Sequence, residues 1–156
     1  MPVRGCPRWA LEVRHYATED RVETFEELAE RLAATPFYAW AGITLLSSGD
    51  GTVELALDVA PHHLNVQGLA HGGMLATLAD TAAGLAVRTK LGPGRRHVTV
   101  QLSVQYLSPA PAGRVVARGR AVRVGSQIAY AEADIVDENG RELVRATSTL
   151  SVTKER

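Results

Sequence analysis

Residues 63–87 read "HLNVQGLAHGGMLATLADTAAGLAV" and contain the clearest structural signal of the chain. The second half of this stretch consists almost entirely of small and apolar residues, which predicts a long helix over residues 73–91, closed by basic residues and the turn sequence "GPG". Asp80 is the one acidic residue of this helix. An ionised carboxylate is costly to bury without partners. We therefore expect Asp80 to be exposed, to be hydrogen-bonded, or to work as a base.

Shorter elements surround this helix. "TFEELAERLAAT", residues 24–35, has Thr24 and Glu27 at capping-box spacing, and Pro36 ends the helix that they predict. Strands are predicted over 42–48 and 52–59, around the turn Gly49-Asp50-Gly51, and then over 97–107, 114–124, 128–136 and 143–152. This order of helix, two strands, long helix and four strands lacks strand–helix alternation. It predicts an α+β fold with an antiparallel sheet and the long helix on one face.

Length and composition predict one ordinary folded domain. The chain has 156 residues, of which 46% are apolar and 22% charged. No run approaches 18 apolar residues, and the charged N-terminus lacks the apolar core of a signal peptide, so we expect a cytoplasmic protein without a membrane partner. Residues 1–22 are predicted to be an N-terminal extension and 23–156 the folded domain. The single cysteine, Cys6, cannot form an internal disulfide.

Charge is spread unevenly along the chain. Net charge is zero, yet no acidic residue occurs between Asp80 and Glu132. That span contains Arg88, Lys90, Arg95, Arg96, Arg114, Arg118, Arg120 and Arg123. These side chains can lie on solvated strand faces and pair with acidic residues, or they can form a surface that binds phosphates. We expect no nucleic-acid partner, because aromatic residues make up only 5% and no zinc-finger, RNA-recognition or basic-helix signature is present.

Polar and glycine residues gather just before the long helix. Gly72 and Gly73 fall at its N-terminus, where backbone N–H groups lack partners and a ligand oxygen can approach without meeting a Cβ. This arrangement suits an oxyanion hole, although a plain loop-to-helix turn has the same sequence. Asn65 offers both a donor and an acceptor to a ligand, or it closes an Asx turn.

Helix geometry separates Gly72 from Asp80. Eight residues span about 12 Å of helix, so one carbonyl group cannot contact both residues of the same chain. Two such helices laid antiparallel across a two-fold axis near Ala76 would bring Gly72 of one subunit to Asp80 of the other. The small residues around Asp80 permit that approach. We therefore predict a homodimer with two identical composite sites.

Together these residues resemble the hotdog-fold acyl-CoA thioesterases, most closely the PaaI-like type of phenylacetic acid degradation. The resemblance covers roughly residues 36–153 and rests on the pattern N-x(5)-HGG-x(6)-D, followed by the strand pattern T-V-x-L-x-V-x-Y-L-x-P. It implies a long helix wrapped by an antiparallel sheet, and dimers that join their sheets side by side. Residues 23–156 are then a hotdog thioesterase domain. Such dimers often pair again into tetramers, so we expect a dimer of dimers.

The resemblance also implies roles for residues of the site. Asp80 acts as general base on water or as nucleophile on the thioester carbonyl, and the Gly72 N–H polarises that carbonyl. Asn65 helps to place the carbonyl or the water, and Thr99 holds the water near the carboxylate. His71 shapes the loop or contacts the thioester. Asp80 and the hydroxyl come from one subunit, and Asn65 and Gly72 from the other.

Coenzyme A enters this scheme as part of the substrate, and no separate cofactor is expected. Gly73 is predicted to bind substrate beside Gly72. The turn of Gly125 and Ser126 with Arg123 resembles the turn that contacts coenzyme A in the family. Many relatives have a basic residue where Ser126 stands, so the resemblance leaves open which arginine holds the nucleotide phosphates.

Three alternatives remain at this point. The chain could be a non-catalytic acyl-CoA-binding protein of the same fold, or a hotdog dehydratase or hydratase that uses His71 for proton transfer. A metal site at His62, His63 and His71 is disfavoured, because no cysteine or acidic residue stands at ligand spacing. The acyl group is not determined. Phe37, Tyr38 and Trp40 could line its pocket or close the end of the core.

Overall fold

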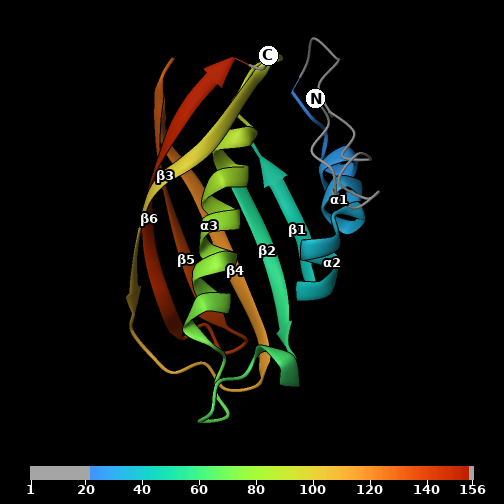
Figure 1. Cartoon of the computed structure of the whole chain (residues 1–156), viewed down its shortest axis with the longest axis vertical. Coiled ribbons are helices and arrows are strands. Elements are labelled where there is room, and N and C mark those ends of the chain that lie inside the picture. Colours follow the sequence, from blue (N-terminus) through green and yellow to red (C-terminus); the bar gives the residue numbers. More distant parts are fainter. Residues whose placement is uncertain (1–21, 155–156) are drawn as a thin grey trace, which may run out of the picture.

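The computed structural model describes residues 22–154, in which three α-helices accompany one antiparallel sheet (Figure 1). Cys6 and nearly all of the predicted N-terminal extension lie outside this range. The elements, in chain order, are α1 (Phe25–Ala34), α2 (Pro36–Ala41), β1 (Ile43–Gly49), β2 (Thr52–Val59), α3 (Gly72–Arg88), β3 (Arg95–Tyr106), β4 (Gly113–Val124), β5 (Ile128–Asp137) and β6 (Glu142–Lys154).

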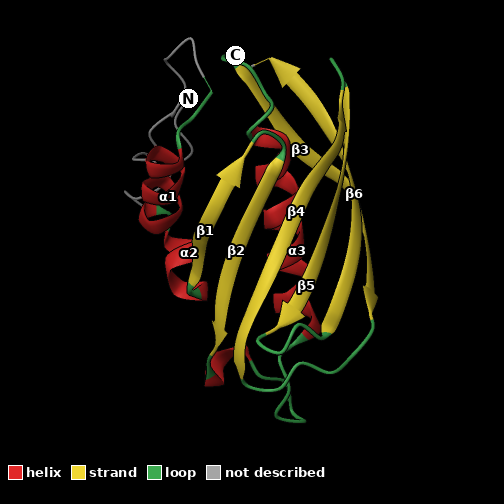
Figure 2. Ribbon diagram, turned by 180° about the vertical axis from the view of Figure 1, so that it is seen from behind, coloured by secondary structure: helices red, strands yellow, loops and turns green. Residues whose placement is uncertain are grey.

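All six strands pair antiparallel, in the order β1-β2-β4-β5-β6-β3. The long helix α3 lies along one face of the sheet, and the sheet curves around it (Figures 1 and 2). This is the predicted α+β architecture of a long helix wrapped by an antiparallel sheet. The outer strands are β1 and β3, so each has one side that pairs with no other strand among the described residues.

Small side chains let α3 lie close to the sheet. Ala79, Ala82, Ala83 and Ala86 on α3 are all buried. On the facing strand β4, a Cβ added to Gly119 would lie only 2.1 Å from the carbonyl oxygen of Ala82. Helix backbone and strand backbone therefore touch at this point. The contact fixes the height of the helix over the sheet two residues beyond Asp80.

The first helix begins as its sequence predicts, but a second helix follows it. Thr24 and Glu27 form the capping box, with the Thr24 hydroxyl accepting from the Glu27 N–H at 3.3 Å. Leu28 and Leu32 then pack into the core. Pro36 was predicted only to end this helix, yet it also begins α2, because proline suits the first turn of a helix.

Unbroken alternation along β3 would place Val98 and Val100 on the same face as Leu102 and Val104, but the strand departs from it at one point. Val98 and Val100 are each 59% exposed on the outer face, whereas Leu102 and Val104 pack toward the core. The pairing of β3 with β6 shifts by one residue between Thr99 and Gln101, which is a β-bulge. The extra residue reverses the side-chain alternation. Thr99 and the even-numbered residues after the bulge therefore share the face that meets α3.

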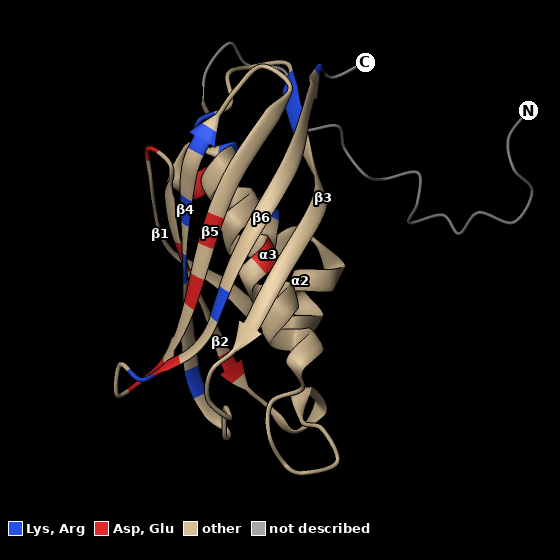
Figure 3. Cartoon of the chain, turned by 90° about the vertical axis from the view of Figure 1, so that its left-hand side faces the viewer, with Lys and Arg blue, Asp and Glu red and all other residues tan. Residues whose placement is uncertain are grey.

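Cross-strand ion pairs cover part of the outer face of the sheet, where Figure 3 shows charged residues of both signs. The pairs of β4 arginines are Arg114–Asp58 (3.9 Å), Arg118–Glu54 (3.0 Å) and Arg120–Glu132 (2.6 Å). For these three arginines, pairing with acidic residues is the right interpretation. Arg95, Arg96 and Arg123 form no ion pair with another residue of 22–154. No helix within this range is long and apolar enough to cross a membrane.

Candidate active site

Asp80 near the middle of α3 meets Thr99 of β3. The Thr99 hydroxyl donates a hydrogen bond to the Asp80 carboxylate (Oγ1 to Oδ1, 2.9 Å), and both residues are half-buried. The bulge in β3 turns Thr99 toward the helix, and the small neighbours Ala83 and Gly84 leave room around the carboxylate. The second carboxylate oxygen, Oδ2, makes no hydrogen bond within residues 22–154. It is therefore the oxygen that can accept a proton.

The helix N-terminus presents one free backbone donor. His71 is the N-cap, and its Nδ1 accepts a hydrogen bond from the Gly73 N–H at 2.9 Å. That bond occupies the donor of Gly73, and it leaves the proton of a neutral His71 ring on Nε2. The Gly72 N–H has no acceptor among the described residues. It lies at the positive end of the helix dipole, where developing negative charge is stabilised.

Asn65 closes an Asx turn and keeps its donor. Its side-chain Oδ1 accepts from the backbone N–H groups of Gln67 (2.9 Å) and Leu69 (3.2 Å). The turn is also closed by the Asn65 N–H, which donates to the Leu69 carbonyl at 2.7 Å. Only the Nδ2 amide remains available. Asn65 can therefore act on a ligand as a hydrogen-bond donor, and not through Oδ1.

A cavity of about 280 Å³ joins Asn65 to Gly72. Its other walls are formed by Leu69, Ala70, Leu75, Tyr106 and the loop over residues 107–110. Asp80 and Thr99 do not line it, because Asp80 lies two turns further along α3 and Thr99 contacts Asp80 from β3. One chain thus carries two half-sites on one helix, a donor half at its N-terminus and a carboxylate half near its middle. Gly72 and Asp80 both belong to one unbroken helix, in which eight residues correspond to about 12 Å.

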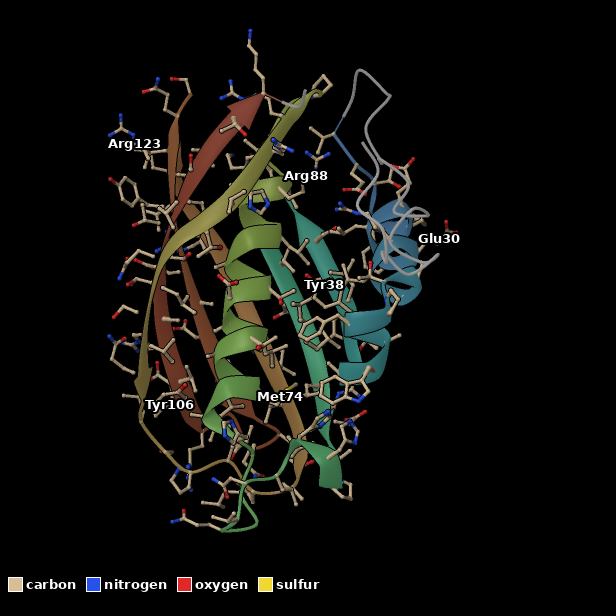
Figure 4. The ribbon with its side chains drawn as sticks, in the orientation of Figure 1. Glu30, Tyr38, Met74, Arg88, Tyr106 and Arg123 are labelled. Atoms are coloured by element: carbon tan, nitrogen blue, oxygen red, sulfur yellow. The ribbon has the colours of Figure 1, made fainter. Side chains whose placement is uncertain are left out.

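The turn predicted to contact coenzyme A lies at the other end of the sheet. Figure 4 shows Arg123 near the end of β4 and Tyr106 near the opposite end of the molecule. The Gly125 N–H donates to the Ile128 carbonyl at 2.9 Å, which closes the turn tightly. The guanidinium of Arg95 donates to the Ser126 carbonyl. Arg95 therefore joins Arg123 at this turn as a second basic side chain.

The aromatic residues after α1 divide into two groups. Tyr38 packs against the core between α2 and α3, and Met74 packs from the first turns of α3 (Figure 4). Phe37 and Trp40 are exposed. Of the three aromatic side chains, only Tyr38 therefore turns toward the long helix.

The histidines of the loop before α3 contact aromatic rings. The rings of His62 and His63 lie 3.9 Å apart, and Trp40 packs against both. Burial, and then the neighbouring His62, lowers the pKa of His63. His71 is engaged as the helix N-cap. Within residues 22–154, no three histidine, cysteine, aspartate or glutamate side chains are placed to hold a metal ion.

Sequence analysis did not single out His97 or Tyr106. His97 packs against Gly84, where an added Cβ would lie 3.2 Å from its Cε1 atom. Burial, followed by the charges of Arg88 and Arg31, lowers the pKa of His97 to about 4. Tyr106 donates from its hydroxyl to the Gly72 carbonyl at 2.8 Å. Only the bulge in β3, which the sequence does not reveal, turns both Thr99 and Tyr106 toward α3.

Known proteins resemble this chain in sequence. Residues 67–144, half of the 156-residue chain, match the family profile described as Thioesterase superfamily. The human protein named acyl-coenzyme A thioesterase 13 is 32% identical over 105 residues, which cover 65% of this chain and 73% of the relative.

Solved structures resemble it in fold. A thioesterase from Haemophilus influenzae superposes with a TM-score of 0.80 at 27% identity, covering 86% of this chain and 94% of its own. A Streptococcus mutans protein, solved with acetyl-CoA bound, superposes with a TM-score of 0.68 at 30% identity, covering 73% of this chain and 90% of its own. The E. coli PaaI protein from the phenylacetic acid degradation operon superposes with a TM-score of 0.76 at 21% identity, covering 83% of this chain and 93% of its own. At this identity the comparison shows a shared fold.

Proposed function

Because this chain belongs to the thioesterase superfamily, as its sequence motifs predicted, we propose that it is an acyl-CoA thioesterase. It would hydrolyse the thioester of an acyl- or aryl-acyl-CoA to the free acid and coenzyme A. The names of its relatives support this class of substrate, since one is an acyl-coenzyme A thioesterase and another was solved with acetyl-CoA bound. The observation that carries the proposal is the Thr99–Asp80 hydrogen bond, which leaves one carboxylate oxygen free on a helix of small residues.

In this proposal Asp80 supplies the base. Its free oxygen takes a proton from water as the water oxygen attacks the thioester carbonyl carbon. The tetrahedral intermediate then collapses, the C–S bond breaks, and the proton that Asp80 took passes to the departing thiolate of coenzyme A, which restores the carboxylate. In the alternative, the carboxylate attacks the carbonyl itself, the C–S bond breaks as the thiolate of coenzyme A leaves, and water hydrolyses the resulting anhydride to the free acid and Asp80. Thr99 supports both routes, because its hydroxyl fixes the orientation of the carboxylate.

The developing oxyanion requires donors near the carbonyl. The Gly72 N–H and the Asn65 Nδ2 amide are the two candidates, because both are free and both line the same cavity. They lie in the donor half-site, away from Asp80 of the same chain. We therefore propose a homodimer in which Gly72 and Asn65 of one subunit face Asp80 and Thr99 of the other. The free side of β3 is the edge at which two sheets could join. Such dimers could pair again into a dimer of dimers.

The nucleotide end of coenzyme A carries phosphates and needs cations. Arg123, together with Gly125 and Ser126, remains the proposed contact. The ion-pair pattern supports this choice, because Arg114, Arg118 and Arg120 are engaged with carboxylates whereas Arg123 pairs with no carboxylate of residues 22–154. Arg95 joins the proposal, since its guanidinium reaches the same turn.

The test is release of coenzyme A, followed with a thiol-reactive dye, from short-chain, long-chain and aryl acyl-CoAs. Wild type is compared with Asp80→Asn, which keeps the shape of the side chain and removes the base. Asp134→Asn makes the same chemical change on the outer face of the sheet and serves as the control. We expect turnover to fall by about 10²- to 10⁴-fold in Asp80→Asn alone, the range for loss of a general base. Equal rates in all three proteins would contradict the role of Asp80, and no release from any ester would favour a non-catalytic binding protein.

A further inference from the structure

Tyr106 contacts the first residue of α3 in two ways. Its hydroxyl donates to the Gly72 carbonyl at 2.8 Å, and its ring lies over the Gly72 Cα, where an added Cβ would come within 3.2 Å of Cζ and of the hydroxyl oxygen. Figure 4 shows Tyr106 beside the N-terminal end of α3. The residue that carries the free donor is thus held from the neighbouring strand.

A helix that begins with two glycines needs such support. Glycine loses more conformational freedom on ordering than any other residue, so Gly72 and Gly73 do not by themselves hold one backbone orientation. His71 fixes the Gly73 N–H from one side. Tyr106 fixes the Gly72 carbonyl from the other side. Both bonds hold the peptide group between Gly72 and Gly73. The Gly72 N–H belongs to the preceding peptide group, whose His71 carbonyl accepts from the Met74 and Leu75 N–H groups. Tyr106 therefore acts on the donor from the other side of the Gly72 Cα, to which the donor nitrogen is bonded.

Tyr106 adds little to the hydrophobic core. Its side chain is 53% exposed, and it lines the cavity that also contains Asn65 and Gly72. Core packing alone would not require the hydroxyl group of an exposed ring. The β-bulge before Gln101 is needed to place this hydroxyl, because Thr99 and Tyr106 are seven residues apart and would otherwise point to opposite faces of β3.

We propose that Tyr106 is a positioning residue, which fixes the Gly72 N–H so that it points at the carbonyl of the substrate. The proposal rests on the proposed thioesterase function and deepens it. One strand, β3, would then serve both halves of the site, because Thr99 orients the carboxylate and Tyr106 orients the oxyanion donor. Tyr106 acts through Gly72 and takes no part in the proton transfer.

The test is Tyr106→Phe, which keeps the ring and removes only the hydroxyl. Tyr130→Phe is the matched control, because Tyr130 is similarly exposed, at 48%, but lies on β5. We expect kcat for acyl-CoA hydrolysis to fall by about tenfold in Tyr106→Phe, with KM changed by less than about twofold. The reason is that a poorly oriented Gly72 N–H weakens the hydrogen bond to the transition state more than it weakens substrate binding. Urea-unfolding midpoints of the two variants should agree, which separates positioning from a general loss of stability.

A second measurement does not depend on activity. With ¹⁵N-glycine labelling, the Gly72 and Gly73 amides of Tyr106→Phe should show lower heteronuclear NOE values than those of wild type, and Tyr130→Phe should show no change. Unchanged kcat, or unchanged glycine amides, would overturn the positioning role. Wild type without turnover would overturn the proposed function instead, and the amide measurement would still decide whether Tyr106 orders this turn.

Discussion

At Gly119 on β4 the backbone of the sheet meets the backbone of the long helix, and Gly119→Ala should destabilise the protein strongly. The new Cβ would lie 2.1 Å from the Ala82 carbonyl oxygen, whereas ordinary van der Waals contact begins at 3.4 Å. The helix must therefore retreat by about 1.3 Å (3.4 − 2.1), since a backbone carbonyl cannot rotate away as a side chain can. Overpacking a core costs about 1–3 kcal/mol, and we expect the upper end of that range here.

Urea denaturation at fixed protein concentration measures this cost directly. Gly92→Ala is the matched control, because nothing lies within 4 Å of a Cβ at Gly92. Its free energy of unfolding should stay within about 0.5 kcal/mol of wild type. For a chain of this size, a loss of 3 kcal/mol lowers Tm by about 6–12 °C. A Gly119→Ala protein as stable as Gly92→Ala would refute the reasoning that backbone contact sets the height of α3.

Three further outcomes follow from the site and its surroundings. Gly72→Pro removes the proposed oxyanion donor at a helix position that accepts proline, and kcat should fall by about 10²- to 10³-fold. Gly72→Ala adds a Cβ against Tyr106, as proline does, but keeps the N–H, so its kcat should stay well above that of Gly72→Pro; similar rates in the two variants would remove the donor role. Thr99→Val removes the hydrogen bond to Asp80 and should lower kcat about tenfold at nearly constant KM; an unchanged kcat would contradict the orienting role of Thr99. The pKa of His97 is about 4 when folded and near 6.5 when unfolded, so the unfolded chain binds the proton first as pH falls. The free energy of unfolding should therefore decrease from about pH 6.5 to pH 4, by up to about 3 kcal/mol. In urea titrations over this pH range, His97→Gln should lack that decrease, and a His97→Gln protein with the same pH dependence as wild type would show that the assignment is wrong.

The elements with strong local signals could be predicted from the sequence. The capping box at Thr24 and Glu27, the hairpin around Gly49-Asp50-Gly51, and the apolar run of α3 depend on contacts within a few residues, and each is present. Two features were missed for physical reasons. Pro36 can end one helix and begin the next, so its identity alone does not distinguish the two. The bulge near Val100 depends on the pairing of β3 with β6, which a single strand sequence does not contain.

In the candidate site, too, some features could be predicted from the sequence and others could not. The pattern around His71 and Asp80 predicted a set of site residues, and the structure places one of them, Thr99, against Asp80. The interpretation of Asn65 as an Asx turn and its interpretation as a ligand donor are compatible, because its oxygen serves the turn and its amide stays free. The hydroxyl of Tyr106 could not be assigned to the site, since plain alternation places it on the face opposite Thr99.

We propose an acyl-CoA thioesterase whose sites each combine Asp80 of one subunit with Gly72 of the other. The most direct test is to co-express Asp80→Asn with Gly72→Pro and to measure coenzyme A release from the mixed protein. A heterodimer of these inactive parents has one site with both groups intact. Random pairing makes about half of the dimers mixed, and each mixed dimer has one intact site out of two. We therefore expect about a quarter of wild-type turnover. Turnover no higher than that of the two parents would contradict a site shared between subunits.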